Sequence, residues 1–189
     1  WFSHNKSMYS CQILEPGEVT QALSCVYALE AYWLSRAPKP LASYTLGCAT
    51  YLDVTHSYAA YENLSKKLNP ILIKNFGWLY KKITDALQPQ WGEMVIHPQL
   101  AHPGFHIFGA PKNQLLSEQA CRLMEKPIAS IHVDVPYRSH MNQWKFFNDV
   151  DFLNPLSITL CLSLPEQGGG LNLWHELDKR SKDPNLYKD

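Results

Sequence analysis

The chain has 189 residues, which is enough for one domain with a sizeable hydrophobic core. Apolar residues make up 46% of the sequence and charged residues 18%, and 17 basic side chains balance 17 acidic ones. This composition is typical of a soluble globular protein. The formal charge of zero argues against nucleic acid or an anionic membrane as the partner. No apolar run reaches the roughly 18 residues that a membrane-spanning helix needs.

The five cysteines are scattered through the chain and form no Cys-x-x-Cys pair. This pattern argues against a disulfide framework and a cysteine-rich zinc site, and it fits a reducing cytoplasm. Four of the five lie in apolar or helical sequence, so we expect them to be small buried side chains. The chain begins at Trp1 without a signal-peptide pattern and ends on a polar stretch, and we expect both ends to be cut relative to the natural protein.

The first half of the sequence predicts three helices, delimited by prolines and by apolar residues at helical spacing. Their expected ranges are about 16–36, 55–67 and 71–87. Pro38 should end the first helix, and Pro70 should separate the other two, because proline removes a backbone donor inside a helix. Residues 44–53 are compact and apolar, and they fit either a helix or a strand.

The second half changes to the alternation of strands, with turns rich in Pro, Gly and Asn. The expected strands cover residues 94–96, 105–108, 129–135, 156–164 and 171–174, and a short helix is expected at about 114–125. Helices followed by strands predict an α+β fold, with the helices packed on one face of a mostly antiparallel sheet. We expect a single domain, with a helical part over about residues 1–90 and a strand part over about residues 91–189.

The segment around His132 and Asp134 carries the most informative chemistry. Alternation along a strand places these two side chains on one face and apolar neighbours on the other. An imidazole and a carboxylate side by side suit one divalent metal ion, and two His with one carboxylate are typical of non-haem Fe(II) oxygenases. Taken alone, the His-x-Asp tripeptide is better explained as a hydrogen-bonded pair in an ordinary strand, so the surrounding sequence decides between the two interpretations.

That context begins at residues 155–164, where small, mildly polar side chains alternate with Ile and Leu, as in a strand that lines a cavity. A turn, Glu166-Gln167-Gly168-Gly169-Gly170, and a further predicted strand follow. His132-x-Asp134 followed by LSLPEQGGGLNLW resembles the prolyl-hydroxylase-like branch of the Fe(II)/2-oxoglutarate-dependent dioxygenases. The preceding HPGFHIFG resembles small bacterial members that act on free amino acids. The resemblance spans residues 94–174.

The resemblance implies a double-stranded β-helix, a jelly roll with iron inside, and N-terminal helices packed on one face. His132 and Asp134 match the family's first two iron ligands. The third ligand is a His on a later strand, and His175 follows the Gly-rich turn too soon for that position. We therefore expect the third ligand, and the Arg or Lys that pairs with the far carboxylate of 2-oxoglutarate, beyond Asp189. The implied reaction consumes 2-oxoglutarate and dioxygen and yields succinate, carbon dioxide and a hydroxylated small molecule.

Four other residues are candidates for binding 2-oxoglutarate or the substrate: Tyr137, Arg138, Thr159 and His106. Arg138 could bind a carboxylate through two N–H groups, and Thr159 belongs to the cavity side of its predicted strand. The alternative for Tyr137 and Arg138 is strand-end packing and surface charge. His106, like His97 and His102, also fits a surface or a hydrogen-bonded core histidine.

Three function classes are compatible with the sequence. Hydroxylation of a small molecule is the leading hypothesis. Halogenation is disfavoured, because related halogenases carry a small residue where this chain has Asp134. The third class is a non-catalytic double-stranded β-helix protein, or a cupin-like protein with another metal, since the third ligand is unassigned. The sequence predicts neither the substrate nor the oligomeric state.

Overall fold

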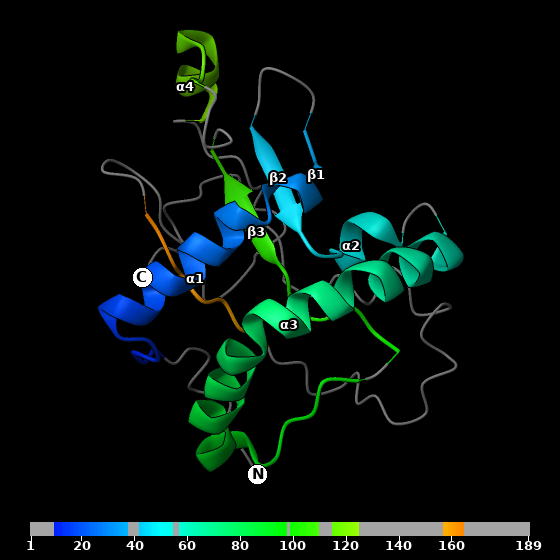
Figure 1. Ribbon diagram of the computed structural model, residues 1–189, viewed down its shortest axis with the longest axis vertical. Coiled ribbons are helices and arrows are strands. Elements are labelled where there is room, and N and C mark those ends of the chain that lie inside the picture. The colour runs from blue at the N-terminus through cyan, green and yellow to red at the C-terminus, as the bar shows by residue number, and fades with distance from the viewer. Residues whose placement is uncertain are drawn as a thin grey trace, which may run out of the picture. The chain divides into compact units, whose positions relative to one another are not determined.

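The computed structural model describes residues 10–37, 42–54, 57–97, 99–109, 115–124 and 157–164 (Figure 1). Residues 10–12 and 161–164 belong to one compact unit, and the described residues between 13 and 160 belong to another. The expectation of a single domain stays a prediction. In the described ranges, no helix combines the length and the apolar character needed to cross a membrane.

All the regular elements of the described residues lie in the larger unit. In chain order they are α1 (Pro16–Ala28), the 3-10 helix η1 (Glu30–Tyr32), β1 (Leu34–Ser35), β2 (Ser43–Leu46), α2 (Thr50–Asp53), α3 (Tyr58–Trp91), β3 (Phe105–Phe108) and α4 (Glu118–Met124). The short helix α4 falls inside the range that the sequence predicted for it.

Helix α1 begins at Pro16, as predicted, but it ends at Ala28 rather than near Arg36. Its first turn is capped by Glu18, whose carboxylate accepts a hydrogen bond from the Glu15 amide at 2.8 Å. Past the helix, the Trp33 indole N–H donates to the carbonyl of Val26 at 3.1 Å. The chain then enters β1, because pairing with β2 replaces the helical hydrogen bonds that residues after Ala28 would have made.

The ambiguous segment 44–53 contains both kinds of element, a strand and then a short helix. Gly47 separates β2 from α2 with a φ of 104°, a conformation that residues with a Cβ rarely adopt. The helix predicted over about 16–36 is therefore wrong at β1, whereas β2 falls mainly in the segment for which helix and strand were both open.

A single 34-residue helix, α3, replaces the two helices that were expected on either side of Pro70. Ser57 caps its start by accepting a hydrogen bond from the Ala60 amide at 3.0 Å. Pro70 is exposed, and so is Lys66, whose carbonyl loses its helical partner and can be hydrated instead. Proline on the solvent side bends a helix around the core, and Figure 1 shows α3 bent along its length.

The sheet is antiparallel and has three strands in the order β1-β2-β3. Strand β3 has the predicted bounds, 105–108. Two other strand predictions are wrong, because residues 94–96 and 157–164 have no regular secondary structure. The strands predicted at 129–135 and 171–174 lie outside the described residues, so the double-stranded β-helix stays a prediction.

One face of the sheet packs on α3. Leu46 and Phe105 are paired across β2 and β3, and the ring of Phe76 from α3 lies 4.4 Å from that of Phe105, centroid to centroid. The most deeply buried large side chains come mainly from this layer: Tyr61, Phe76, Leu46, Leu72, Leu79 and Val54. Burying a side chain of this size stabilises the fold by roughly 1.5–3 kcal/mol. The opposite face of the sheet carries Thr45 and His106, and it positions the polar groups described next.

Candidate functional site

The central residues of the predicted iron site lie outside the described residues. This holds for His132, Asp134, Tyr137 and Arg138, and also for His175. Two predicted site residues are described. Thr159 is exposed in a segment without regular structure, and His106 lies in the middle of β3. The described residues therefore do not test the predicted ligand set, and the iron site stays a prediction.

Among the residues that the structure describes, no group of three or more His, Cys, Asp or Glu side chains is placed to hold a metal ion. His97, His102 and His106 do not form such a group with one another or with the other described residues. A metal ligand set in this chain would have to draw on other residues.

His106 stands on the face of the sheet away from α3, directly opposite Thr45. Its ring stacks at 6.0 Å on that of Tyr51 and at 6.4 Å on that of Phe108. The residue is exposed on the sheet surface, but partial desolvation of the ring and then the positive charge of Arg36 lower the pKa of the imidazole. His106 is therefore neutral at pH 7, with one nitrogen able to donate a hydrogen bond and the other able to accept one.

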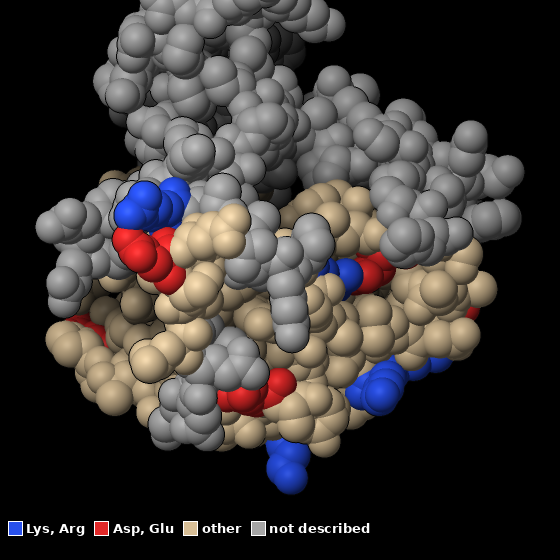
Figure 2. Space-filling view, turned by 90° about the horizontal axis from the view of Figure 1, so that it is seen from above, with Lys and Arg blue, Asp and Glu red and all other residues tan. Residues whose placement is uncertain are grey.

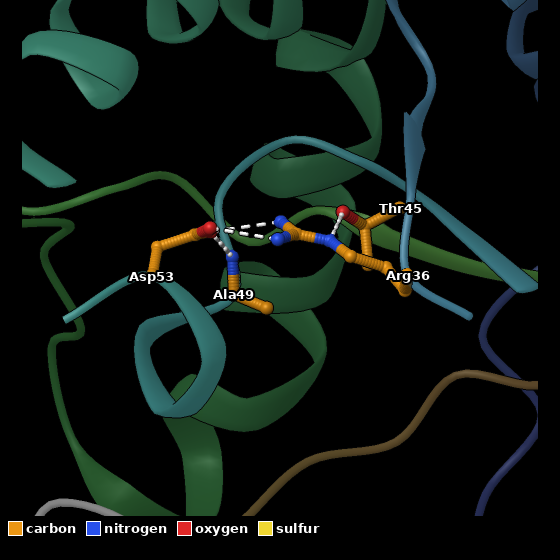
Figure 3. A network of polar contacts seen from close by, with 4 residues as sticks. All are labelled: Arg36, Thr45, Ala49 and Asp53. Carbon is orange, nitrogen blue, oxygen red and sulfur yellow. Dashed lines mark hydrogen bonds and ion pairs between the residues drawn. The ribbon is translucent and has the colours of Figure 1, made fainter. Parts of the chain in front are cut away.

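Beside His106 lies an ion pair between Arg36 and Asp53 (Figure 3). The guanidinium donates two parallel hydrogen bonds to the carboxylate, at 2.7 and 2.8 Å, and its Nε donates to the Thr45 hydroxyl at 2.7 Å. Asp53 also accepts from the backbone amide of Ala49 at 2.8 Å. The two side chains are only 15% and 10% exposed, so the pair is largely desolvated.

This network joins three local structures: the end of β1, strand β2 and helix α2. Thr45 is buried although it faces away from α3, and Arg36 accounts for its hydrogen bond there. The sequence did not predict the pair, because Arg36 was expected at the end of a helix. One signal was present: Asp53 is an acidic residue at the end of a compact apolar segment, where a buried carboxylate needs a cationic partner.

A second polar cluster fixes the loop of residues 99–104 to α3, and we call it the loop clamp. The Tyr61 hydroxyl accepts from the Ala101 amide at 2.8 Å, and the Tyr80 hydroxyl donates to the Pro103 carbonyl at 2.6 Å. Asn69 makes two bonds to the loop: its amide donates to the Leu100 carbonyl, and its oxygen accepts from the His102 amide, both at 2.9 Å. The clamp sets where β3 begins, because Phe105 follows the loop directly.

At the end of the loop clamp, Gly104 meets the turn after β2 backbone to backbone. A Cβ added to Gly104 would lie 2.5 Å from the carbonyl oxygen of Leu46 and 3.2 Å from the Cα of Gly47. Only glycine fits such an approach, so this position helps to set the β2–β3 register.

His102 occupies the loop clamp with its ring 5.8 Å from that of Tyr80. Its Nδ1 is buried and has no hydrogen-bond partner. Burial lowers the pKa of the imidazole. The expectation of a surface or hydrogen-bonded core histidine is therefore wrong for the Nδ1 of His102.

The cysteines differ from expectation. Only Cys48 is buried, Cys25 is partly buried, and Cys11, Cys121 and Cys161 are exposed. All five are free thiols. Burial raises the pKa of the Cys48 thiol to about 12, with the negative charge of Asp53 adding to the effect. Cys48 is thus an inert core residue in the cluster with Val54, Tyr61 and Leu68.

Charged side chains are not gathered into one large patch on the face shown in Figure 2, where Lys and Arg lie in small groups separated from one another. Comparisons with protein-family models, with curated proteins and with solved structures find no match to this chain. A function for the chain therefore has to be inferred from the chemistry of the residues themselves.

Proposed function

We propose that the chain is an Fe(II)- and 2-oxoglutarate-dependent oxygenase that hydroxylates a C–H bond of a small molecule such as a free amino acid. The observation that carries the proposal is the sequence His132-Val133-Asp134, followed by an alternating segment and the Gly-rich turn after Glu166. Free thiols at all five cysteines suit a reducing cytoplasm, where we place the protein.

The donor set fits iron. Imidazole nitrogen and carboxylate oxygen in a two-His-one-carboxylate set are suitable ligands for Fe(II) with open positions. His132 and Asp134 would hold the ion with a His from a later strand, and the described residues offer no competing cluster. When bound, iron with 2-oxoglutarate supplies the activation of dioxygen, and the protein supplies ligand geometry and substrate placement.

The remaining roles belong to residues that position ligands. Arg138 would pair with a carboxylate of 2-oxoglutarate or of the substrate, and Tyr137 and Thr159 would donate hydrogen bonds to the same groups. His106 is neutral at pH 7, because burial and Arg36 lower its pKa. It could therefore hydrogen-bond a substrate without adding charge to the site.

The proposal is tested with the full-length protein by measuring succinate released from 2-oxoglutarate in the presence of Fe(II) and a panel of free amino acids. We expect release that depends on both Fe(II) and one of the amino acids. The variant His132→Ala should abolish it, because it removes one of three ligands. His97→Asn is the matched control, since His97 lies outside the proposed site and Asn keeps an acceptor for the Gln99 amide.

The outcomes separate the function classes. Succinate release that survives His132→Ala contradicts the site assignment. Iron binding that is lost in His132→Ala, without any succinate release from the wild-type protein, supports the non-catalytic double-stranded β-helix protein instead. A chlorinated product in the presence of chloride would support halogenation, against the expectation from Asp134.

A further inference from the structure

The loop clamp holds its segment by hydrogen bonds from neutral side chains only. Tyr61, Asn69 and Tyr80 of α3 make all four of the bonds described above. Burial raises the pKa of both tyrosines, so neither becomes an anion near neutral pH. The loop also makes apolar contacts, because Leu100 and Ala101 pack against the cluster of Cys48, Val54, Tyr61 and Leu68, and Gly104 meets the backbone of Leu46 and Gly47. A positive charge on a side chain of the loop would therefore meet no opposite charge among Tyr61, Asn69 and Tyr80.

His102 is the residue of the loop for which this condition can fail. When the imidazole is neutral, its buried Nδ1 lacks a hydrogen-bond partner, and this one unsatisfied polar atom lowers the stability of the docked loop. A protonated imidazole would instead place a positive charge on a half-buried ring and turn its buried Nδ1 into an N–H donor without an acceptor. Burial is the one cause of its pKa shift, and no charged side chain in the described part of the chain contributes. Protonation would thus weaken the clamp without compensation from an ion pair.

We propose that the loop clamp is a pH-sensitive latch, in which protonation of His102 detaches residues 99–104 from α3 and frees the start of β3. Detachment would expose the imidazole to water and end the burial of its charge. The same event would break the bonds to Asn69 and Tyr80, because the amide of His102 itself donates to Asn69 and the next residue, Pro103, accepts from Tyr80. The latch is independent of the proposed iron site and operates whether or not that site exists.

The direction of the pH effect follows from the pKa. The pKa of His102 lies below 6.5 when the loop is docked, so the detached loop binds a proton more readily than the docked loop does. Docking is therefore fully stable above pH 6.5 and weakens as the pH falls below it. Once the pH is below the pKa that His102 has in the docked loop, the stability of docking falls no further.

The test is hydrogen exchange at the amides of Ala101 and His102, which donate to Tyr61 and Asn69. Protection factors, corrected for intrinsic exchange, are measured on the full chain between about pH 5 and pH 8. We expect protection at both amides to fall as the pH falls, while amides in the middle of α3 keep theirs. The variant His102→Phe keeps a flat ring beside Tyr80 but cannot be protonated, and it should lose the pH response.

Two control variants separate His102 from the other described histidines. His97→Asn and His106→Gln each remove one imidazole, and both should keep the pH response of the loop amides. The direct NMR titration of the His102 ring in the wild-type protein gives an answer even if His102→Phe does not fold. A ring that titrates without changing the loop amide signals overturns the proposal. So does a pH response that persists in His102→Phe.

Discussion

At the scale of single residues, the Arg36–Asp53 pair is the feature with the largest predicted effect. A desolvated ion pair contributes little over a well-packed apolar pair, because removing both charges from water offsets most of their attraction. The loss of one partner is different, since the other charge then stays buried and uncompensated. Here Asp53 also satisfies the Ala49 amide, so its removal affects three donors at once, two on Arg36 and one on Ala49.

We therefore predict that Asp53→Asn lowers the free energy of unfolding by about 3–5 kcal/mol, measured by urea denaturation. The matched control is Asp85→Asn, which breaks an exposed pair with Lys81 on α3, with side chains 75% and 55% exposed. The control substitution should lower the free energy of unfolding by less than about 0.5 kcal/mol. The double variant Arg36→Leu with Asp53→Leu should recover part of the loss, because it leaves no buried charge. Equal losses of unfolding free energy in Asp53→Asn and Asp85→Asn would contradict this interpretation of the Arg36–Asp53 pair.

At the scale of elements, the sequence predicted those that local patterns specify. The start of α1 was found from Pro16 and strand β3 from its alternation, and α4 lies inside the range predicted for a short helix. The errors occurred where tertiary contacts override local rules. Pro70 does not break α3, because Pro70 and Lys66 are both exposed, so water can hydrate the Lys66 carbonyl to which proline cannot donate. Similarly, β1 forms only because β2 is available to pair with it.

Alanine substitutions at two glycines should change the stability of these elements in opposite directions. Gly104→Ala should destabilise the protein by about 1–3 kcal/mol or more, because its Cβ would meet the backbone of Leu46, which cannot move aside without disturbing β2. Gly77→Ala should instead stabilise it by about 0.5–1 kcal/mol. Gly77 lies inside α3, and an added Cβ there has no neighbour within 4 Å.

Thermal unfolding of the two glycine variants tests both the predicted loss of stability and the predicted gain. A neutral Gly104→Ala would mean that the contact between the loop and the turn after β2 does not set the sheet register. A destabilising Gly77→Ala would mean that α3 needs flexibility at that position.

At the scale of the whole molecule, the predicted function and the described structure concern different parts of the chain. The chemistry was inferred from His132 and Asp134, whereas the described polar networks centre on Arg36 and on His102. The sequence could predict a ligand pair because two residues in one strand share a face by local geometry. It could not predict the partner of Asp53 or the acceptors of the loop clamp, because those depend on which distant segments meet.

Cysteine accessibility gives a test at this scale. We predict that a thiol reagent at pH 8 modifies Cys11, Cys121 and Cys161 in the native protein and leaves Cys48 unmodified. Cys48 is buried and its pKa is about 12, so almost none of it is thiolate at that pH. Peptide mass spectrometry after labelling identifies the modified residues, and labelling in denaturant should reach Cys48 as well. Rapid native labelling of Cys48 would contradict the described core.

The connectivity of the sheet has a consequence for how the protein folds. Strands β2 and β3 pair directly, yet α2 and the whole of α3 lie between them in the sequence. Closing so long a segment costs chain entropy before any strand pairing can compensate for it. A helix forms from local contacts in far less time. We therefore expect α3 to form first and to act as the template on which β3 meets β2, so that core substitutions in α3 slow folding more than substitutions at the sheet edge.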